Sequence, residues 1–399
     1  MNQAYCNRSL LENYLDYAEF QESPLDFHLW VLLTLTSAAT ARKVFLSRAY
    51  YKLYPNVYSS VVAESAWCRK SISMDIGMSI FIEAFPEYPV LSGKITPAEL
   101  ISFLAPDEEL GDPNSTANVF IHADEMSVFF SNSMVVEGMV DLITTMYMCP
   151  NKKDFRTKTQ GTYIIYNSYL TILSGTVPSY LQKNVGDAFK EGFIGRNSYC
   201  HREKRKRKTP RPEVVVDFEK MQELREVIIQ QLRSIGNISG EFSYNEEAGL
   251  IYDKWYEEIP DKDTSGDNKT FSTGYKGRIG DHVLKFAMLH HLCNSVEVVD
   301  LILTDKDILT GIKLAESAEA SLTTIFEDIE MDIFRYQDEI EKIIRSSGKV
   351  MRSILFSKFR KKITVTQFDI IIHSLKVSCT INEKVEGKST YYYWNVEEG

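Results

Sequence analysis

Lys70 and Ser71 are the residues whose types and position point most directly to chemistry. They come after the apolar segment YSSVVA and open the helical pattern that continues as ISMDIGM. A strand, a turn and a helix in this order let backbone N–H groups and the helix N-terminus face a phosphate. A lysine in the turn adds positive charge at the β- and γ-phosphates, and the next hydroxyl ligates Mg²⁺. The segment therefore indicates a nucleotide-binding loop.

The loop departs from the usual phosphate-binding motif at both of its glycine positions. Glu64 stands at the first position and Arg69 at the second. The Glu64 carboxylate would repel a phosphate if it pointed inward, and Trp67 makes the loop bulky. The alternative interpretation is that Lys70 and Ser71 simply open an ordinary helix.

Two adjacent carboxylates follow the next clear strand. The segment VFIHADE is apolar up to Ala123 and ends in Asp124 and Glu125. A carboxylate at this place can hold the hydration shell of Mg²⁺, and its neighbour can orient or deprotonate an attacking water. We assign the first role to Asp124 and the second to Glu125. The alternative is a surface Asp-Glu pair after a strand.

Two further segments carry candidate residues. The strand pattern YLTILSGT ends in small polar residues, so either Ser174 or Thr176 could contact the γ-phosphate; a plain strand-to-turn transition is the alternative. Arg196 follows the glycine-containing turn GFIG. Such an arginine could reach the γ-phosphate of a neighbouring subunit as an arginine finger. The alternative is an ordinary surface arginine.

The elements that must position these residues predict an α/β fold. Residues 1–45 read as a helical N-terminal segment, and residues 46–205 alternate strands with helices, which is typical of a parallel sheet. We interpret this second part as a P-loop NTPase core. Residues 206–330 have a helical pattern and are predicted to form a lid. Residues 331–399 read as helices followed by a hairpin, an order compatible with a winged helix.

Composition limits the class of protein. The chain has 399 residues, which predicts two or three domains. Its net charge of −10 argues against a protein that coats nucleic acid, since such proteins are usually basic. A local basic stripe could still bind DNA. The run HREKRKRK at 201–208 could line a DNA channel or could be a solvated linker.

Cysteine usage and hydropathy point to the cytoplasm. The six cysteines form no CxxC pair, which argues against a zinc ribbon and fits thiols in a reducing compartment. The first residues lack the basic start and apolar run of a signal peptide. The longest apolar-leaning stretch, 27–41, is shorter than the roughly 20 residues that span a bilayer. We expect a cytoplasmic protein without a membrane partner.

In chain order, these segments resemble the helicase-like P-loop ATPases of phage and mobile-element primase-helicases. The resemblance covers roughly residues 20–330. In that family the first loop often ends in Arg-Lys-Ser, and here the loop ends in Arg69, Lys70 and Ser71. It is carried by the segments LYPNVYSSVVAESAWCRKS, KITPAEL, VFIHADEMSVFF, YLTILSGTVPSYL, EGFIGRNSY and YKGRIGDHVLKFAML.

The resemblance implies an ATP-dependent DNA helicase or translocase that acts in replication. ATP and Mg²⁺ would be its cofactors, single-stranded DNA its substrate track, and a homo-oligomeric ring its working form. No primase domain is visible in the sequence, so a separate primase or replisome protein is an expected partner. The implied nucleotide contacts are Ser65, Arg69, Lys70, Ser71 and Arg278, the implied Mg²⁺ ligands are Ser71 and Asp124, and the implied catalytic residues are Glu125 and Arg196. Glu64 and Ala66 depart from the family pattern, which leaves the catalytic rate open.

Two other classes of function remain open at this point. The altered loop fits a scaffold or regulator that binds nucleotide but turns it over slowly. The C-terminal region fits a DNA-binding initiator or repressor, in which the hairpin Lys384–Trp394 is either a DNA-reading wing or an edge that docks a protein.

Overall fold

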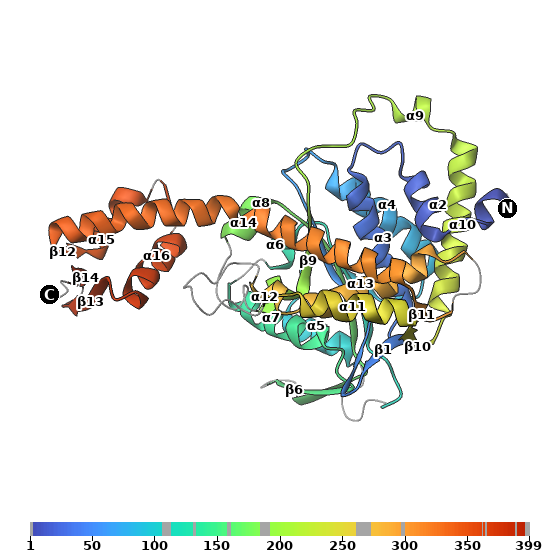
Figure 1. The fold of residues 1–399 in the computed structure, drawn as a ribbon, viewed down its shortest axis with the longest axis horizontal. Coiled ribbons are helices and arrows are strands. Elements are labelled where there is room, and N and C mark those ends of the chain that lie inside the picture. Colours follow the sequence, from blue (N-terminus) through green and yellow to red (C-terminus); the bar gives the residue numbers. More distant parts are fainter. Residues whose placement is uncertain are drawn as a thin grey trace. The chain divides into compact units, whose positions relative to one another are not determined.

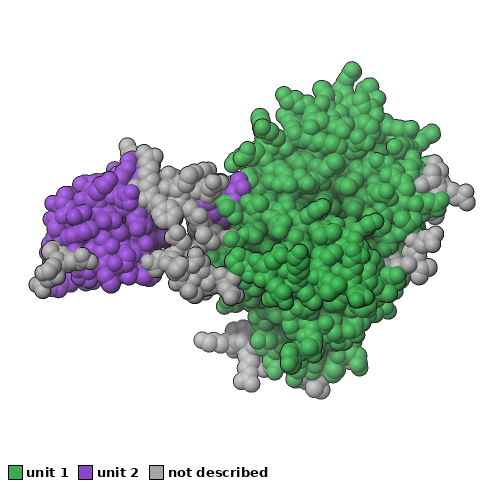
Figure 2. Space-filling model, viewed as in Figure 1, with its two compact units in different colours: residues 1–178, 187–323 green, residues 179–186, 324–399 purple. Residues whose placement is uncertain are grey.

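The structure is a computed structural model, and its contacts divide the chain into two compact units. The first comprises residues 1–178 and 187–323, and the second comprises 179–186 and 324–399 (Figure 2). The boundary expected near residue 331 lies close to this division, whereas the boundaries expected at 45 and 205 fall inside the first unit. The residues that the structure describes are 3–105, 113–130, 133–157, 161–183, 192–260, 273–296, 300–360, 362–363, 365–387 and 389–395.

A five-stranded parallel sheet forms the centre of the first unit. The strand order is β4-β5-β8-β3-β9, and all four neighbouring pairs are parallel. Every residue of β3 and β8 is buried, as expected of strands covered on both faces. The predicted α/β fold with a parallel sheet is confirmed. The strands are β3 (Tyr58–Val62), β4 (Val90–Ser92), β5 (Asn118–Ala123), β8 (Tyr169–Thr176) and β9 (Asn197–His201).

A group of helices packs together in the first unit (Figure 1). α3 is buried along almost its whole length because it is apolar on all sides, and it contacts both β3 and β8. α10 packs on α2, α3 and α4, and α13 packs on α3. The helices are α2 (Leu10–Tyr17), α3 (Leu25–Thr40), α4 (Lys70–Ala84), α10 (Phe218–Gly236) and α13 (Ile279–Asn294).

The region predicted to be a helical lid is joined to the N-terminal segment. β10 pairs in parallel with β1 and with β11, so this region also contains strands. The pattern GEFSY buries only Phe242, and such a short strand leaves little periodicity to find in the sequence. The sheet order is β11-β10-β1-β2, with β1 (Val44–Arg48), β2 (Tyr51–Leu53), β10 (Gly240–Tyr244) and β11 (Ile302–Leu303).

Shorter elements connect these layers. β6 and β7 pair with each other as a two-stranded antiparallel ribbon. None of the helices in the described parts of the chain combines the length and apolar character needed to cross a membrane. The connecting elements are α1 (Gln3–Cys6), α5 (Pro97–Leu104), α6 (Met126–Phe129), α7 (Ser133–Tyr147), β6 (Lys152–Thr157), β7 (Gly161–Tyr166), α8 (Pro178–Lys183), η2 (Ile194–Arg196), α9 (Pro212–Val215), α11 (Glu246–Glu257) and α12 (Thr273–Lys276).

The second unit has its own core of buried Ile, Leu and Phe side chains, among them Ile340, Leu355 and Phe368. Its elements follow one another as helix, strand, two helices and hairpin, and its antiparallel sheet has the order β12-β14-β13. α14 begins in the first unit and ends in the second. The elements are α14 (Asp305–Ser347), β12 (Lys349–Met351), α15 (Arg352–Phe359), α16 (Val365–Val377), β13 (Ile381–Glu386) and β14 (Ser389–Trp394).

Candidate functional site

The loop between β3 and α4 contains two non-glycine residues with left-handed backbone conformations. Ala66 has a φ of 61° and Arg69 a φ of 53°, so both are in the left-handed region. That conformation costs a non-glycine residue roughly 1–2 kcal/mol. Arg69 occupies the second glycine position of the motif, and its Nε lies 2.9 Å from Glu22 Oε2. The position therefore keeps the glycine-like backbone without the glycine.

Lys70 is the first residue of α4, and its side chain is only 5% exposed. Its Nζ donates to Glu125 Oε1 at 3.1 Å and to Ala63 O at 3.4 Å. The ammonium group therefore lies where the carboxyl ends of the parallel strands meet, near the ends of β3 and β5. We call this side of the sheet the carboxyl edge. Ser65 and Ser71 are exposed, in the loop and in the first turn of α4.

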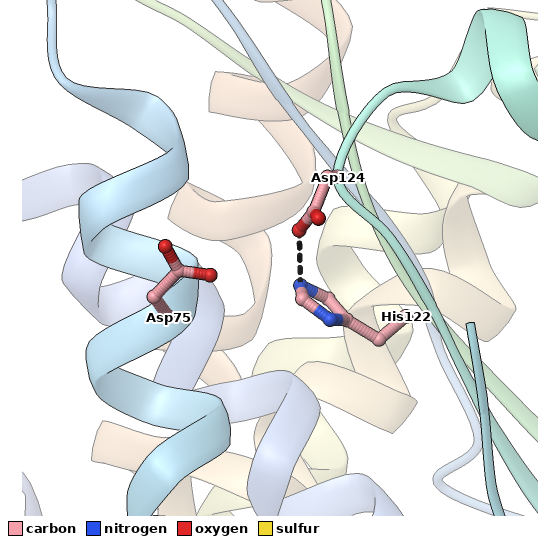
Figure 3. A group of neighbouring side chains, drawn as sticks. All are labelled: Asp75, His122 and Asp124. Carbon is pink, nitrogen blue, oxygen red and sulfur yellow. Dashed lines mark ion pairs between the residues drawn. The ribbon is translucent and has the colours of Figure 1, made fainter. Parts of the chain in front are cut away.

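Asp124 follows β5 and is 68% exposed, with Oδ1 3.3 Å from His122 Nε2. Figure 3 shows its carboxylate turned toward the His122 ring, with Asp75 of α4 opposite them. Burial lowers the pKa of His122, while the carboxylates of Asp124 and Asp75 oppose that shift. Burial, with the charge of Asp124, raises the pKa of Asp75. Neither His122 nor Asp75 was among the residues predicted from the sequence. Asp75 follows Ser71 by four positions, a spacing that places these two residues on one face of α4 and could have drawn attention to Asp75.

The two candidate γ-phosphate contacts on β8 are both buried. Ser174 Oγ lies 2.7 Å from Ser60 Oγ, which also accepts from Asn197 Nδ2 at 2.7 Å, so Ser174 links strands inside the sheet. The hydroxyl of Thr176, the last residue of β8, has no hydrogen-bond partner among the described residues. Of the two hydroxyls, only that of Thr176 lies at the end of β8 without a hydrogen bond to a described residue, so Thr176 is the better candidate contact. A Cβ on Gly175 would lie 2.5 Å from Asp124 O, so glycine lets the ends of β8 and β5 approach.

The two candidate arginines lie at the opposite edge of the sheet, where the amino ends of the strands meet; we call this the amino edge. Arg196 directly precedes β9, whose first residue Asn197 pairs with Tyr58, the first residue of β3. The five residues of β3 place this edge roughly 17 Å from the edge that holds Lys70. The structure therefore does not bring Arg196 to Lys70 within one chain.

Arg196 and Arg278 form a pair held by backbone carbonyls. Nη1 of Arg196 donates to Gly192 O at 2.8 Å, and Nη1 of Arg278 donates to Gly274 O at 2.7 Å. Burial, with the positive charge of Arg278, lowers the pKa of Arg196. Arg278 therefore lies near Arg196 and does not reach the loop at 64–69.

The basic run at 201–208 is matched by acidic residues of the N-terminal segment. Glu22 pairs with Arg205 at 3.0 Å, in addition to its ion pair with Arg69. Arg202 pairs with Asp26 at 2.7 Å, and Arg207 pairs with Glu19 at 3.5 Å. The guanidinium of Arg205 also lies 5.7 Å from the centre of the Trp67 ring. These ion pairs neutralise much of the charge of the basic run within the chain.

No protein-family model matches the chain, and no curated protein matches it.

Proposed function

We propose that this chain binds ATP with Mg²⁺ at the carboxyl edge of its parallel sheet and hydrolyses it, as a P-loop ATPase does. One observation carries the proposal. Lys70 Nζ, from the helix that follows β3, meets Glu125 Oε1, from the end of β5, at 3.1 Å. Ligands of open α/β sheets bind outside the carboxyl ends of the strands, where these two residues lie.

The loop and α4 supply the groups that a triphosphate needs. The first N–H groups of a helix have no partner within that helix, and the helix dipole favours an anion there. The left-handed residues Ala66 and Arg69 turn the preceding backbone, as in other anion-binding concavities. Lys70 would exchange the Glu125 carboxylate for phosphate oxygens.

That exchange would release Glu125 for a second role. Once it no longer pairs with Lys70, its carboxylate can orient or deprotonate the attacking water. Ser71 and Asp124 are the residues that would hold Mg²⁺, which usually keeps several waters and takes few protein ligands. The exposed side chains of both residues leave room for those waters.

Arg196 would complete the site only in a neighbouring copy of the chain. Its place at the amino edge excludes it from the loop at 64–69 in its own chain, and an arginine finger acts equally well in trans. We therefore propose a homo-oligomeric ring in which the amino edge of one subunit meets the carboxyl edge of the next. Arg278 would support Arg196 there.

The finer proposal is a replicative DNA helicase or translocase that works in the cytoplasm with a separate primase or replisome protein. It rests on the resemblance described above. The ion pairs between residues 202–207 and Glu19, Glu22 and Asp26 argue that DNA would have to use a different surface.

The second unit supports another candidate function, a winged-helix DNA reader. Its order of helix, strand, two helices and hairpin, with strand order β12-β14-β13, is the supporting observation. Several cations of this unit are paired with its own acids, including Arg352 with Asp369 at 2.6 Å and Lys349 with Glu386 at 2.7 Å. Duplex binding by the full chain without nucleotide would test this candidate.

ATP hydrolysis measured with and without single-stranded DNA separates these functions. We expect turnover that single-stranded DNA accelerates. Nucleotide binding without turnover would select the scaffold, and turnover that is indifferent to single-stranded DNA would contradict the helicase. Site-specific duplex binding in the absence of nucleotide, without turnover, would select the winged-helix reader.

A further inference from the structure

We propose that Asp75, His122 and Asp124 form a zinc site that binds its metal without nucleotide. Each residue offers one ligand atom, and the three atoms lie within 4.8 Å of one another. Two of the residues come from β5 and its end, and the third comes from α4 (Figure 3).

The spacing of the first two ligands suits a tetrahedral ion. Zn–N bonds are about 2.0–2.1 Å and Zn–O bonds about 2.0–2.2 Å, so two ligands at a tetrahedral angle are about 3.4 Å apart. His122 Nε2 and Asp124 Oδ1 are 3.3 Å apart. The carboxylate of Asp75 is exposed and can move toward them.

The surroundings of the His122 imidazole also favour a metal at this place. The His122 side chain is only 12% exposed, and its Nε2 atom is shielded from solvent without a hydrogen bond to any described residue. A shielded polar atom without a partner is costly, since it loses its water and gains nothing in return. Although Nε2 lies at ion-pair distance from Asp124, the geometry is not that of a hydrogen bond. A metal between them would satisfy both atoms.

The donor set identifies the class of ion. Imidazole favours zinc and its transition-metal neighbours, whereas Mg²⁺ prefers oxygen ligands. Three protein ligands leave a fourth tetrahedral position for water. The site would therefore bind Zn²⁺ in preference to Mg²⁺, even though Asp124 is also the residue proposed to hold Mg²⁺ with ATP.

Titration of the chelator-treated full chain with Zn²⁺ alone tests this proposal. The exposed cysteines Cys6 and Cys379 are replaced by serine in every sample, so that surface thiols do not bind the metal. We expect one Zn²⁺ per chain at this site, and Co²⁺ in its place should give the intense visible bands of a tetrahedral ion. His122→Ala and Asp75→Asn should each weaken Zn²⁺ binding at least about tenfold.

The matched control is His373→Asn, at an exposed histidine of the second unit. It should bind Zn²⁺ as the unsubstituted chain does. Asp75→Asn changes an exposed residue and keeps the test valid if His122→Ala does not fold. Zn²⁺ binding that survives both substitutions, or that equimolar Mg²⁺ abolishes, would overturn the proposal.

Lys70→Ala separates this inference from the proposed ATP site. The variant should lose ATP but still bind Zn²⁺, because Lys70 offers no ligand to the metal. A chain that binds no ATP but still binds Zn²⁺ would contradict only the proposed function. A chain that binds Mg·ATP through Lys70 but no Zn²⁺ would contradict only the zinc site.

Discussion

The two edges of the central sheet hold their charges in different ways. At the carboxyl edge, Lys70 faces the carboxylate of Glu125, and the neighbouring Asp124 is 68% exposed. At the amino edge, Arg196 and Arg278 donate to backbone carbonyls. Ion pairs at an open edge can exchange one partner for a ligand, whereas cations fixed by carbonyls are held in place.

The interior next to the amino edge reinforces this contrast. Lys285 Nζ donates to Asn56 O at 2.9 Å and to Asn56 Oδ1 at 2.8 Å, and it lies 3.7 Å from the centre of the Tyr147 ring. Burial lowers the pKa of Lys285 to about 8. On the proposed function, the carboxyl edge would bind and react, while the amino edge would offer Arg196 and Arg278 to a neighbouring subunit.

The largest expected effect is that of removing the amino-edge arginine. Arg196→Ala should lower ATP hydrolysis by about 10³–10⁵-fold yet spare ATP binding, because an arginine finger acts on the transition state. Steady-state turnover and equilibrium ATP binding measure the two quantities. A mixture of Arg196→Ala and Lys70→Ala chains should recover some activity, since each can complete an interface that the other cannot. No recovery, or a specific rate that is independent of protein concentration, would count against action in trans.

A smaller loss is expected from Glu125→Gln at the carboxyl edge. The amide keeps the shape of the side chain but cannot act as a base, so hydrolysis should fall by about 10²–10⁴-fold while ATP still binds. Single-turnover hydrolysis of bound ATP measures this loss. If the variant turns over ATP at the unsubstituted rate, Glu125 is not the catalytic carboxylate.

Gly175→Ala should destabilise the contact between β8 and β5. The new Cβ would lie 2.5 Å from Asp124 O, a backbone atom, so the chain must shift, at a cost of roughly 1–3 kcal/mol. Chemical denaturation measures the free energy of unfolding. Gly249→Ala in α11 is the matched control: its Cβ meets nothing within 4 Å, and alanine in a helix should stabilise by about 0.5–1 kcal/mol. Equal effects of the two substitutions would disprove the close approach.

Acid should destabilise the amino edge through His282. Its Nε2 lies 3.2 Å from Gly195 O, its ring stacks on Tyr275, and burial lowers its pKa to about 3. Below its ordinary pKa of about 6.5 the unfolded chain takes up a proton that the folded chain does not. The free energy of unfolding should therefore fall from about pH 6.5 toward pH 3, by up to about 1.4 kcal/mol per pH unit from this group. His282→Phe should reduce that slope, and equal slopes in denaturation series across this range would refute the assignment.

The amino-acid sequence predicts the local elements better than the contacts between distant ones. It predicts the strands that end near Lys70 and Asp124, because each is an apolar run followed by polar residues. It does not predict β10 and β11, which are short and depend on pairing with distant partners. Nor does it predict the acids that neutralise residues 202–207, since Glu19 and Glu22 lie more than 180 positions earlier in the chain.

The site residues also differ in how far the sequence predicts their positions. Lys70 and Glu125 lie at the same edge because β3 and β5 run parallel, and the alternation of strands and helices in the sequence predicts parallel strands. The place of Arg196 at the other edge depends on the direction in which β9 enters the sheet. His122 and Asp124 are two residues apart, a spacing that puts both side chains on one face of an extended chain, whereas their nearness to Asp75 depends on how α4 packs on the sheet.

Equilibrium binding of Mg·ATP to the unsubstituted chain and to Lys70→Ala tests the central claim most directly. Loss of a charge-assisted contact costs about 1.5–3 kcal/mol, which corresponds to roughly 10- to 150-fold weaker binding. Lys254→Ala, at an exposed lysine of α11, should bind ATP as the unsubstituted chain does. We predict that Lys70→Ala folds and that its affinity for Mg·ATP falls by at least this factor. A folded Lys70→Ala chain with unchanged affinity for ATP would contradict the assignment of a nucleotide site to the carboxyl edge.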